Sequence, residues 1–178
     1  MRFVPWIKRR LRRLDKEERR MRVDGGTRIA HDADAPKEIV SRTLVRFSCR
    51  FSSVSLIEEE TSLQCGLYHF CAERNEDGKD CSVSCERVFS VCDQRLQAVR
   101  PISFMDEIEA LLRTHNVARF NGKYYFVSGL PSFFGASVDA VFESGETVCC
   151  SNNQDPFLPS SLIKELCCLF ELDSENKD

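Results

Sequence analysis

The sequence lacks any long hydrophobic run. Its 178 residues contain no stretch of about eighteen consecutive apolar residues, the length that a transmembrane helix needs. The first ten residues pass directly from a few apolar side chains into basic ones, without the apolar region of a secretory signal peptide. We therefore expect no transmembrane segment and an intracellular, reducing location, in the nucleus and the cytoplasm.

The common catalytic and nucleotide-binding motifs are missing as well. No G-x-S-x-G, H-E-x-x-H, G-x-x-x-x-G-K-[ST] or G-x-G-x-x-G sequence occurs, so hydrolase, metalloprotease and nucleotide-binding functions have no motif to support them. Histidine is scarce, with three in the chain. A nucleophilic pair such as Cys65 or Cys71 with His115 would rest on residue types alone. The sequence therefore predicts a non-enzymatic protein and leaves a Cys/His nucleophile open.

Cysteine, in contrast, is abundant, with ten in the chain. In a reducing compartment clustered cysteines are more often metal ligands or small buried hydrophobic residues than disulfides. Five of them lie within residues 65–92, around a polar loop that turns at Asp77-Gly78. The spacing C-x5-C-x9-C-x3-C predicts a tetrahedral zinc site. Its ligands would be Cys65, Cys71, Cys81 and Cys85, with His69 as an alternative ligand.

The same cysteines also fit a different interpretation, in which they are buried free thiols. Residues 82–99 have the spacing of an amphipathic helix, with apolar side chains at intervals of four and three positions. On this interpretation Cys85 and Cys92 belong to the hydrophobic core. Cys49 lies on the apolar face of an alternating strand, which also favours the core. The sequence leaves zinc ligation, buried thiols and disulfide or redox chemistry as alternatives.

The charge is distributed unevenly along the chain. The net charge is −3, but residues 1–28 hold eleven Lys or Arg against four Asp or Glu, and residues 29–178 hold 14 against 24. Within residues 6–22 the apolar residues recur at close to helical spacing, so we predict a basic helical arm over residues 1–28. Such an arm fits phosphate contact with nucleic acid or another polyanion through residues 6–22, adhesion to an anionic membrane surface, or nuclear import. Its candidate nucleic-acid-binding residues are Lys8, Arg9, Arg10, Arg12, Arg13, Arg19 and Arg20.

Beyond the arm, we predict a linker over residues 29–42 and one α+β domain over residues 43–172, followed by an acidic tail at 173–178. Strict alternation predicts a strand over residues 44–52, whose polar face carries Arg46 and Arg50 as further candidate nucleic-acid-binding residues.

The rest of the domain is predicted to hold two helices and two hairpins. A capping pattern predicts a helix from Ser103, and apolar spacing predicts a last helix over 162–172. Asn121-Gly122 predicts a hairpin over 117–127 with Arg119 and Tyr124 on one face, both as nucleic-acid contacts. A second hairpin is predicted over 138–150. The expected fold class is α+β, with a small antiparallel sheet and two or three packed helices.

The predicted function is regulation through nucleic-acid binding, RNA in preference to DNA, by a zinc-stabilised protein. In its make-up the chain is similar to small cysteine-rich viral accessory proteins, which act against host RNA or host regulators. That resemblance implies a part in countering host defence. The alternative is a protein-interaction adaptor, in which the arm is only an import signal, the acidic body binds a protein partner and the cysteines are buried free thiols.

Overall fold

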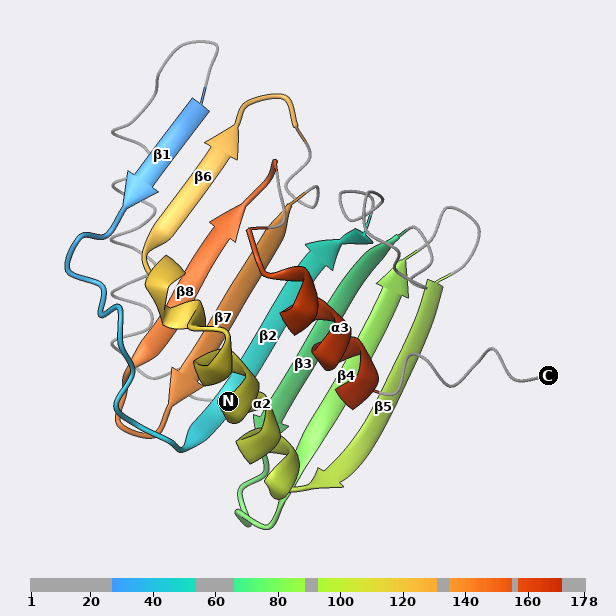
Figure 1. Cartoon of the computed structure of the whole chain (residues 1–178). Helices are drawn as coiled ribbons and strands as arrows, with labels where there is room; N and C mark the ends of the chain where they lie inside the picture. Colours follow the sequence, from blue (N-terminus) through green and yellow to red (C-terminus); the bar gives the residue numbers. More distant parts are fainter. Residues whose placement is uncertain (1–26, 54–65, 89–92, 131–134, 155–156, 171–178) are drawn as a thin grey trace.

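Eight β-strands form one mixed sheet in the part of the chain that the computed structural model describes, residues 27–53, 66–88, 93–130, 135–154 and 157–170 (Figure 1). The strands are β1 (Thr27–His31), β2 (Leu44–Ser52), β3 (Leu67–Arg74), β4 (Asp80–Val88), β5 (Asp93–Pro101), β6 (Lys123–Val127), β7 (Ala136–Phe142) and β8 (Thr147–Asn152). The helices are α2 (Ser103–Thr114), the 3-10 helix η2 (Val117–Phe120) and α3 (Ser160–Leu169).

The strand order across the sheet is β1-β6-β8-β7-β2-β3-β4-β5. Neighbouring strands are antiparallel except for β6 and β8, which pair in parallel. The β3–β4 hairpin closes through Asn75 N, which donates to Asp80 O at 3.0 Å, and its turn holds Gly78 at φ +68°. A positive φ favours glycine because it has no Cβ. The Asp77-Gly78 turn therefore connects two sheet strands.

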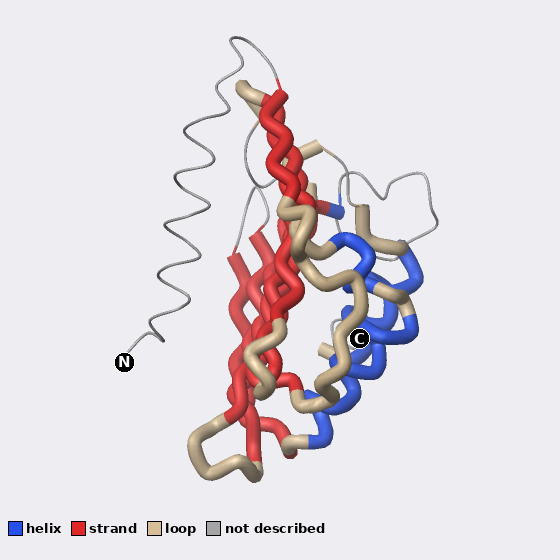
Figure 2. The backbone as a smooth tube through the Cα atoms, turned by 90° about the vertical axis from the view of Figure 1, so that its left-hand side faces the viewer, coloured by secondary structure: helices blue, strands red, loops and turns tan. Residues whose placement is uncertain are grey.

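The helices α2 and α3 cover one face of the sheet, as the edge-on view in Figure 2 shows. Among the described residues no helix lies on the other face, which we call the open face. Side chains alternate between the two faces along each strand. In β3, for example, Tyr68 and Phe70 are buried under the helices, whereas His69 and Cys71 point to the open face and are half-buried.

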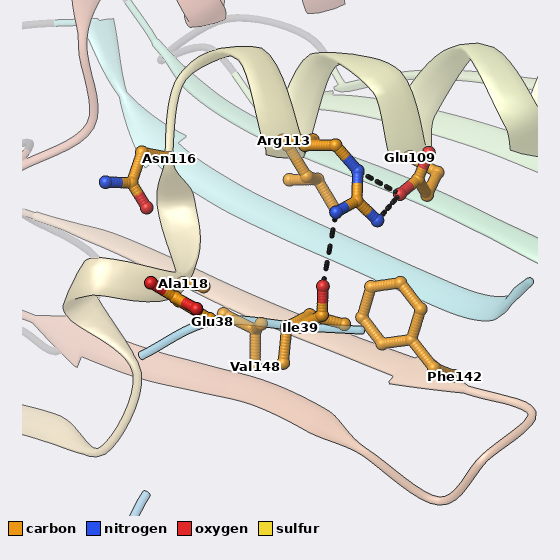
Figure 3. Close-up of a pocket in the computed structure, with 9 residues that line it drawn as sticks. Glu38, Ile39, Glu109, Arg113, Asn116, Ala118, Phe142 and Val148 are labelled. Atoms are coloured by element: carbon orange, nitrogen blue, oxygen red, sulfur yellow. Dashed lines mark hydrogen bonds and ion pairs between the residues drawn. The ribbon is translucent and has the colours of Figure 1, made fainter. Parts of the chain in front are cut away.

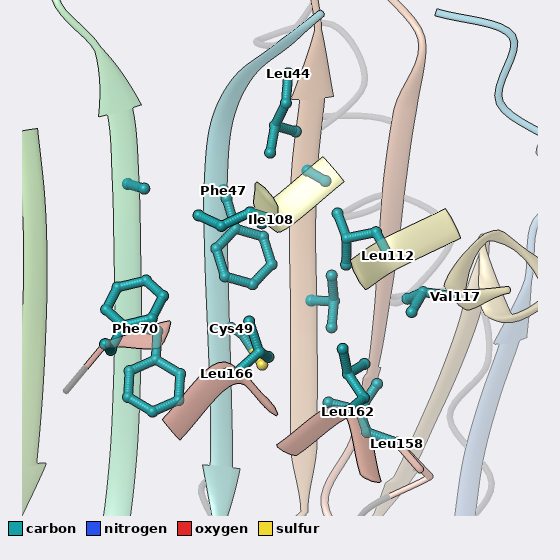
Figure 4. Close-up of a cluster of buried hydrophobic side chains, with 14 of the residues drawn as sticks. Leu44, Phe47, Cys49, Phe70, Ile108, Leu112, Val117, Leu158, Leu162 and Leu166 are labelled. Atoms are coloured by element: carbon teal, nitrogen blue, oxygen red, sulfur yellow. The ribbon is translucent and has the colours of Figure 1, made fainter. Parts of the chain in front are cut away.

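The hydrophobic core lies between the sheet and these two helices (Figure 4). Phe47 and Cys49 of β2 contribute from the sheet, Ile108 comes from α2, and Leu162 and Leu166 come from α3, all at most 1% exposed. Aromatic contacts connect the two layers at the end of α3. The ring of Phe170, directly after the helix, stacks on Phe70 with centroids 4.6 Å apart, and Phe104 of α2 meets the same ring edge-on at 5.2 Å.

The predicted fold class, a small antiparallel sheet with two or three helices, is wrong. The sheet is large and mixed, and two short α-helices accompany it in the described residues. Much of the difference arises in residues 82–99, where the expected helix is replaced by strands β4 and β5. Cys85 is buried there, as the buried-thiol interpretation expected, but Val99 is 65% exposed. The apolar residues spaced four and three positions apart therefore do not form one face of a helix.

The predicted hairpin over 117–127 is also wrong in its first half, because residues 117–120 form η2. Asn121 has φ −53°, whereas a type I′ turn needs a positive φ at both central residues. Its buried side-chain amide instead joins distant backbone: Nδ2 donates to Pro36 O at 2.9 Å and to Thr147 O at 2.7 Å, and Oδ1 accepts from Cys149 N at 2.8 Å. The partner of β6 on one side is β1, which lies partly in the predicted linker.

Several local predictions are confirmed. The strand over 44–52, the helix from Ser103, the second hairpin and the last helix all form, although the last helix ends at Leu169. The predicted capping by Ser103 does not form, because Ile102 is the N-cap residue and no side chain caps the helix. The basic arm lies almost entirely outside the described residues, which begin at residue 27, and so does the acidic tail. No helix in the described ranges is both long and apolar enough to cross a membrane.

Candidate functional site

The structure does not bring the predicted zinc ligands together. Cys71 pairs with Ser84, whereas Cys85 pairs with Phe70 and Cys81 with Arg74, so Cys71 lies on the open face and the other two cysteines lie on the helix-covered face. Positions four residues apart in a strand are also separated by about 13 Å. Cys65 lies outside the described residues. Within the described ranges no group of three or more Cys, His, Asp or Glu side chains could hold a metal ion.

Several cysteines instead occupy the core. Cys49, Cys81, Cys85, Cys150 and Cys167 are at most 3% exposed. Burial raises the pKa of the Cys49 thiol, that of Cys85 to about 11 and that of Cys150 to about 12, because a thiolate loses its hydration in an apolar environment. These thiols remain protonated at neutral pH, which favours the interpretation of the cysteines as core residues.

The predicted nucleic-acid contacts are only partly brought together. Arg46 and Arg50 lie on the open face of β2, where Arg46 forms an ion pair with Asp139 at 3.5 Å and Arg50 is exposed. Tyr124 lies on the same face of β6, three strands from β2, or about 14 Å away. Arg119 is on η2, which contacts α2, and its guanidinium lies 4.5 Å from the Phe120 ring centroid. The predicted pairing of Arg119 with Tyr124 does not form, and Lys8 to Arg20 lie outside the described residues.

The open face carries an ordered polar surface that extends well beyond the polar face of β2 expected from the sequence. Because paired residues of neighbouring strands share a face, the strand register places side chains in rows across the sheet. Two adjacent rows cross β2, β3, β4 and β5. The first row is Ser48, Cys71, Ser84 and Gln97, and the second is Arg50, His69, Glu86 and Arg95.

His69 is the centre of a hydrogen-bonded cluster within these rows. Its Nε2 lies 3.1 Å from Cys71 Sγ and 3.0 Å from Ser48 Oγ. On the other side of the ring, Nδ1 lies 3.6 Å from Glu86 Oε2, and Glu86 Oε1 forms an ion pair with Arg95 Nε at 3.1 Å. A histidine between a thiol and a carboxylate is the arrangement from which cysteine nucleophiles are built.

The electrostatics of the cluster favour its neutral form. Burial, and next the positive charge of Arg50, lower the pKa of His69, although Glu86 opposes the shift. Burial raises the pKa of Cys71, and hydrogen bonds with Ser48 and Ser84 reduce that shift. At neutral pH the pair is therefore a protonated Cys71 thiol beside a neutral His69 imidazole.

A hollow of about 630 Å³ opens on this side of the sheet. Cys71, Ser48 and Ser84 line it, together with Gln97 and Val99 of β5. The hollow is wide enough for a small molecule and places the thiol at its wall. Among the described residues, the open face thus combines a cavity with a thiol and a base.

A smaller cavity of about 230 Å³ lies on the other side of the sheet, between α2 and the chain around Ile39 (Figure 3). Arg113 crosses it, paired with Glu109. The same guanidinium donates to Ile39 O at 3.2 Å and to Ser41 O at 3.3 Å. These contacts hold the segment before β2 against α2, so the polar groups of this cavity have a structural role.

Comparison with protein-family models, with curated proteins and with solved structures finds no match to this chain. The sequence predicted Cys71 as a zinc ligand, with His69 as an alternative ligand of the same site, and offered His115 as the base for Cys65 or Cys71. The alternation over residues 67–72 could have placed His69 and Cys71 on one face of a strand.

Proposed function

We propose that the chain is a non-enzymatic regulatory protein that binds nucleic acid, RNA in preference to DNA, through its basic arm and the open face of its sheet. The charge split carries the proposal: residues 1–28 have an excess of seven positive charges, whereas residues 29–178 have an excess of ten negative charges. A short segment of this kind attracts phosphates while the acidic body repels them. The arm therefore supplies most of the affinity for nucleic acid, and the acidic body restricts where the nucleic acid can bind.

The open face is suited to binding single-stranded nucleic acid. It is a broad surface of strands, on which an exposed arginine and a half-buried tyrosine, Arg50 and Tyr124, belong to the same row across the sheet. Ser137 and Ser151 occupy the positions between them. Bases stack on aromatic rings, and arginine contacts phosphate. Single-stranded segments of RNA are the main target of sequence-selective RNA recognition by proteins. A surface suited to single strands therefore supports RNA over duplex DNA as the ligand.

A salt titration tests the proposal. The affinity for a fluorescent single-stranded RNA oligonucleotide is measured by anisotropy between 50 and 200 mM salt. If the arm contacts about five phosphates, the slope of log K against log salt is about −3.5, which is a loss of about 100-fold over this range. Replacing the five basic residues Lys8, Arg9, Arg10, Arg12 and Arg13 by Gln should remove most of that slope. Absence of binding at 50 mM salt would exclude the proposal.

A matched pair of single substitutions separates the two faces of the body. Arg50→Gln removes one positive charge from the open face and should flatten the slope by about 0.7. Lys164→Gln removes one positive charge from the exposed side of α3 and should leave the slope unchanged. Equal effects of the two substitutions would mean that the open face has no special part in binding.

A protein-interaction adaptor is the second candidate, and one observation favours it. Strand β5 forms an edge of the described sheet and exposes Leu96 (46%) and Val99 (65%). Such an edge can pair with an extended segment of another protein. If the intact chain binds no oligonucleotide at low salt, while a reporter fused to residues 1–24 enters the nucleus, the adaptor function is favoured.

A further inference from the structure

We propose that Cys71 is a nucleophilic thiol that accepts an acyl group from thioesters and other activated esters, with His69 as its base and the hollow on the open face as the acyl-binding site. This inference is independent of nucleic-acid binding, since it rests on the cluster of Cys71, His69, Glu86 and Ser48. The proposed reaction is a single acylation of Cys71 itself, and it does not require the protein to release the acyl group and react again.

The position of Glu86 determines which nitrogen of His69 can act as the base. A neutral imidazole carries one proton, on Nδ1 or on Nε2. Because Nδ1 faces the Glu86 carboxylate at 3.6 Å, the tautomer with the proton on Nδ1 is favoured, as in other histidines oriented by a carboxylate. Arg95 holds the carboxylate from the next strand through Glu86 Oε1. Nε2 is then unprotonated and lies 3.1 Å from Cys71 Sγ.

The choice of nucleophile follows from acidity. Both Ser48 Oγ and Cys71 Sγ lie within reach of Nε2, but Nε2 has one lone pair and accepts from one donor at a time. A thiol gives up its proton far more readily than an alcohol, and its sulfur is intrinsically more nucleophilic. Cys71 is therefore the attacking group, and the hydroxyls of Ser48 and Ser84 beside it can donate to the oxygen of the acyl group.

The transfer step balances without any further reactant. The sulfur of Cys71 forms a bond to the acyl carbon, the thiol proton passes to His69 Nε2, and the acyl–sulfur or acyl–oxygen bond of the donor breaks. The leaving thiolate or alkoxide takes the electron pair of that bond and recovers the proton from His69. The product is a thioester on Cys71 and a neutral imidazole.

The experiment treats the full chain with p-nitrophenyl acetate at pH 7 and locates acetyl groups by peptide mass. Cys168, on the exposed side of α3, is the reference thiol in the same molecule. We expect Cys71 to be acetylated faster than Cys168, although Cys71 is half-buried and Cys168 is exposed. In a variant with His69→Ala we expect the Cys71 rate to fall about 100-fold, the scale of general-base catalysis, and the Cys168 rate to stay unchanged. His69→Gln, which keeps a polar side chain, should have the same effect.

A pH profile of the unaltered protein gives a test that needs no variant. Among the described side chains, the charged groups on this face are Arg46 and Arg50 of β2, Glu73 of β3, Asp80 and Glu86 of β4, Arg95 of β5 and Asp139 of β7. If His69 is the base, the rate of Cys71 acetylation rises with pH as the imidazolium loses its proton, at a pH below the ordinary pKa range of histidine. The rate is then level from about pH 7 to 8. A rate that rises about tenfold per pH unit to above pH 9 would overturn the proposal. A Cys71 rate no higher than that of Cys168 would do the same.

Discussion

The contact between α3 and the sheet gives the sharpest test of the fold. Phe170 is 6% exposed, stacks on Phe70 of β3 and meets Phe104 of α2 edge-on. Replacing a buried Phe with Ala costs about 3–5 kcal/mol, since burial is lost and a cavity remains. Because Phe170 follows the last turn of a helix, where the structure can partly collapse, we expect Phe170→Ala to cost about 3 kcal/mol. That is a large share of the ~5–15 kcal/mol that stabilises a typical domain.

Urea unfolding followed by circular dichroism measures this cost. With a slope of about 2 kcal/mol per molar urea, the midpoint should fall by about 1.5 M. Lys164→Ala, on the exposed side of the same helix, is the control and should change stability by less than about 0.5 kcal/mol. In a double-mutant cycle, Phe70 and Phe170 should couple by about 1 kcal/mol. A cost below 1 kcal/mol for Phe170→Ala, with no coupling, would mean that α3 does not pack on β3.

Three further predictions concern the backbone, the metal and the thiols. Gly122→Ala should lower the melting temperature, because Gly122 has φ +76° and a Cβ there would lie 2.6 Å from the Cβ of Ala35; Gly129→Ala, with φ +93° but open space around it, should cost less. Cys81→Ser should leave the zinc content of protein purified without chelator unchanged, as measured by elemental analysis, because Cys81 and Cys71 face opposite sides of the sheet; release of one zinc would contradict this geometry. The free energy of unfolding, measured with urea, should fall as the pH rises from about 9 towards 12. Burial raises the pKa of thiols such as Cys85 in the folded protein, so the thiols of the unfolded chain ionise at lower pH and favour unfolding. A constant free energy of unfolding over this range would contradict that burial.

The sequence predicted best where local pattern decides the structure. Residues 44–52 alternate strictly, and they form β2 with Phe47 and Cys49 in the core. Adjacent residues of a strand or a helix point in different directions, and in the neighbouring pairs Cys149-Cys150 and Cys167-Cys168 the side chains of Cys150 and Cys167 are buried while Cys168 is exposed. These features depend on periods of two and 3.6 residues, which are visible within a few residues.

Residues 82–99 were predicted wrongly because two different patterns overlap there. Intervals of four and three between apolar residues suggest a helix, whereas Cys81, Val83 and Cys85 alternate as a strand does and are all buried. Strand β5 adds no clear signal, since residues 94–99 are exposed on both faces at the sheet edge. The Asp77-Gly78 turn between two alternating segments was the better indication, as Asp-Gly favours a hairpin.

The cluster on the open face could not be predicted from local pattern. His69 and Cys71, two residues apart, share a face in any strand, so that half was within reach. Glu86 joins them only because β4 pairs with β3 in the register that places Glu86 opposite His69. A shift of one residue would move Glu86 to the other face, so the cluster depends on tertiary pairing that one sequence does not reveal.

The two proposals meet at Arg50. The positive charge of Arg50 is one of the causes that lower the pKa of His69, and Arg50 is also the exposed arginine through which the open face would contact phosphate. A phosphate bound there would offset that charge, raise the pKa of His69 and reduce the neutral imidazole available as a base. Nucleic acid on the open face would therefore slow acylation of Cys71 near pH 6 and have little effect at pH 8, where the imidazole is neutral in both states. Since binding and proton uptake are linked, the affinity for nucleic acid would in turn rise as His69 becomes protonated.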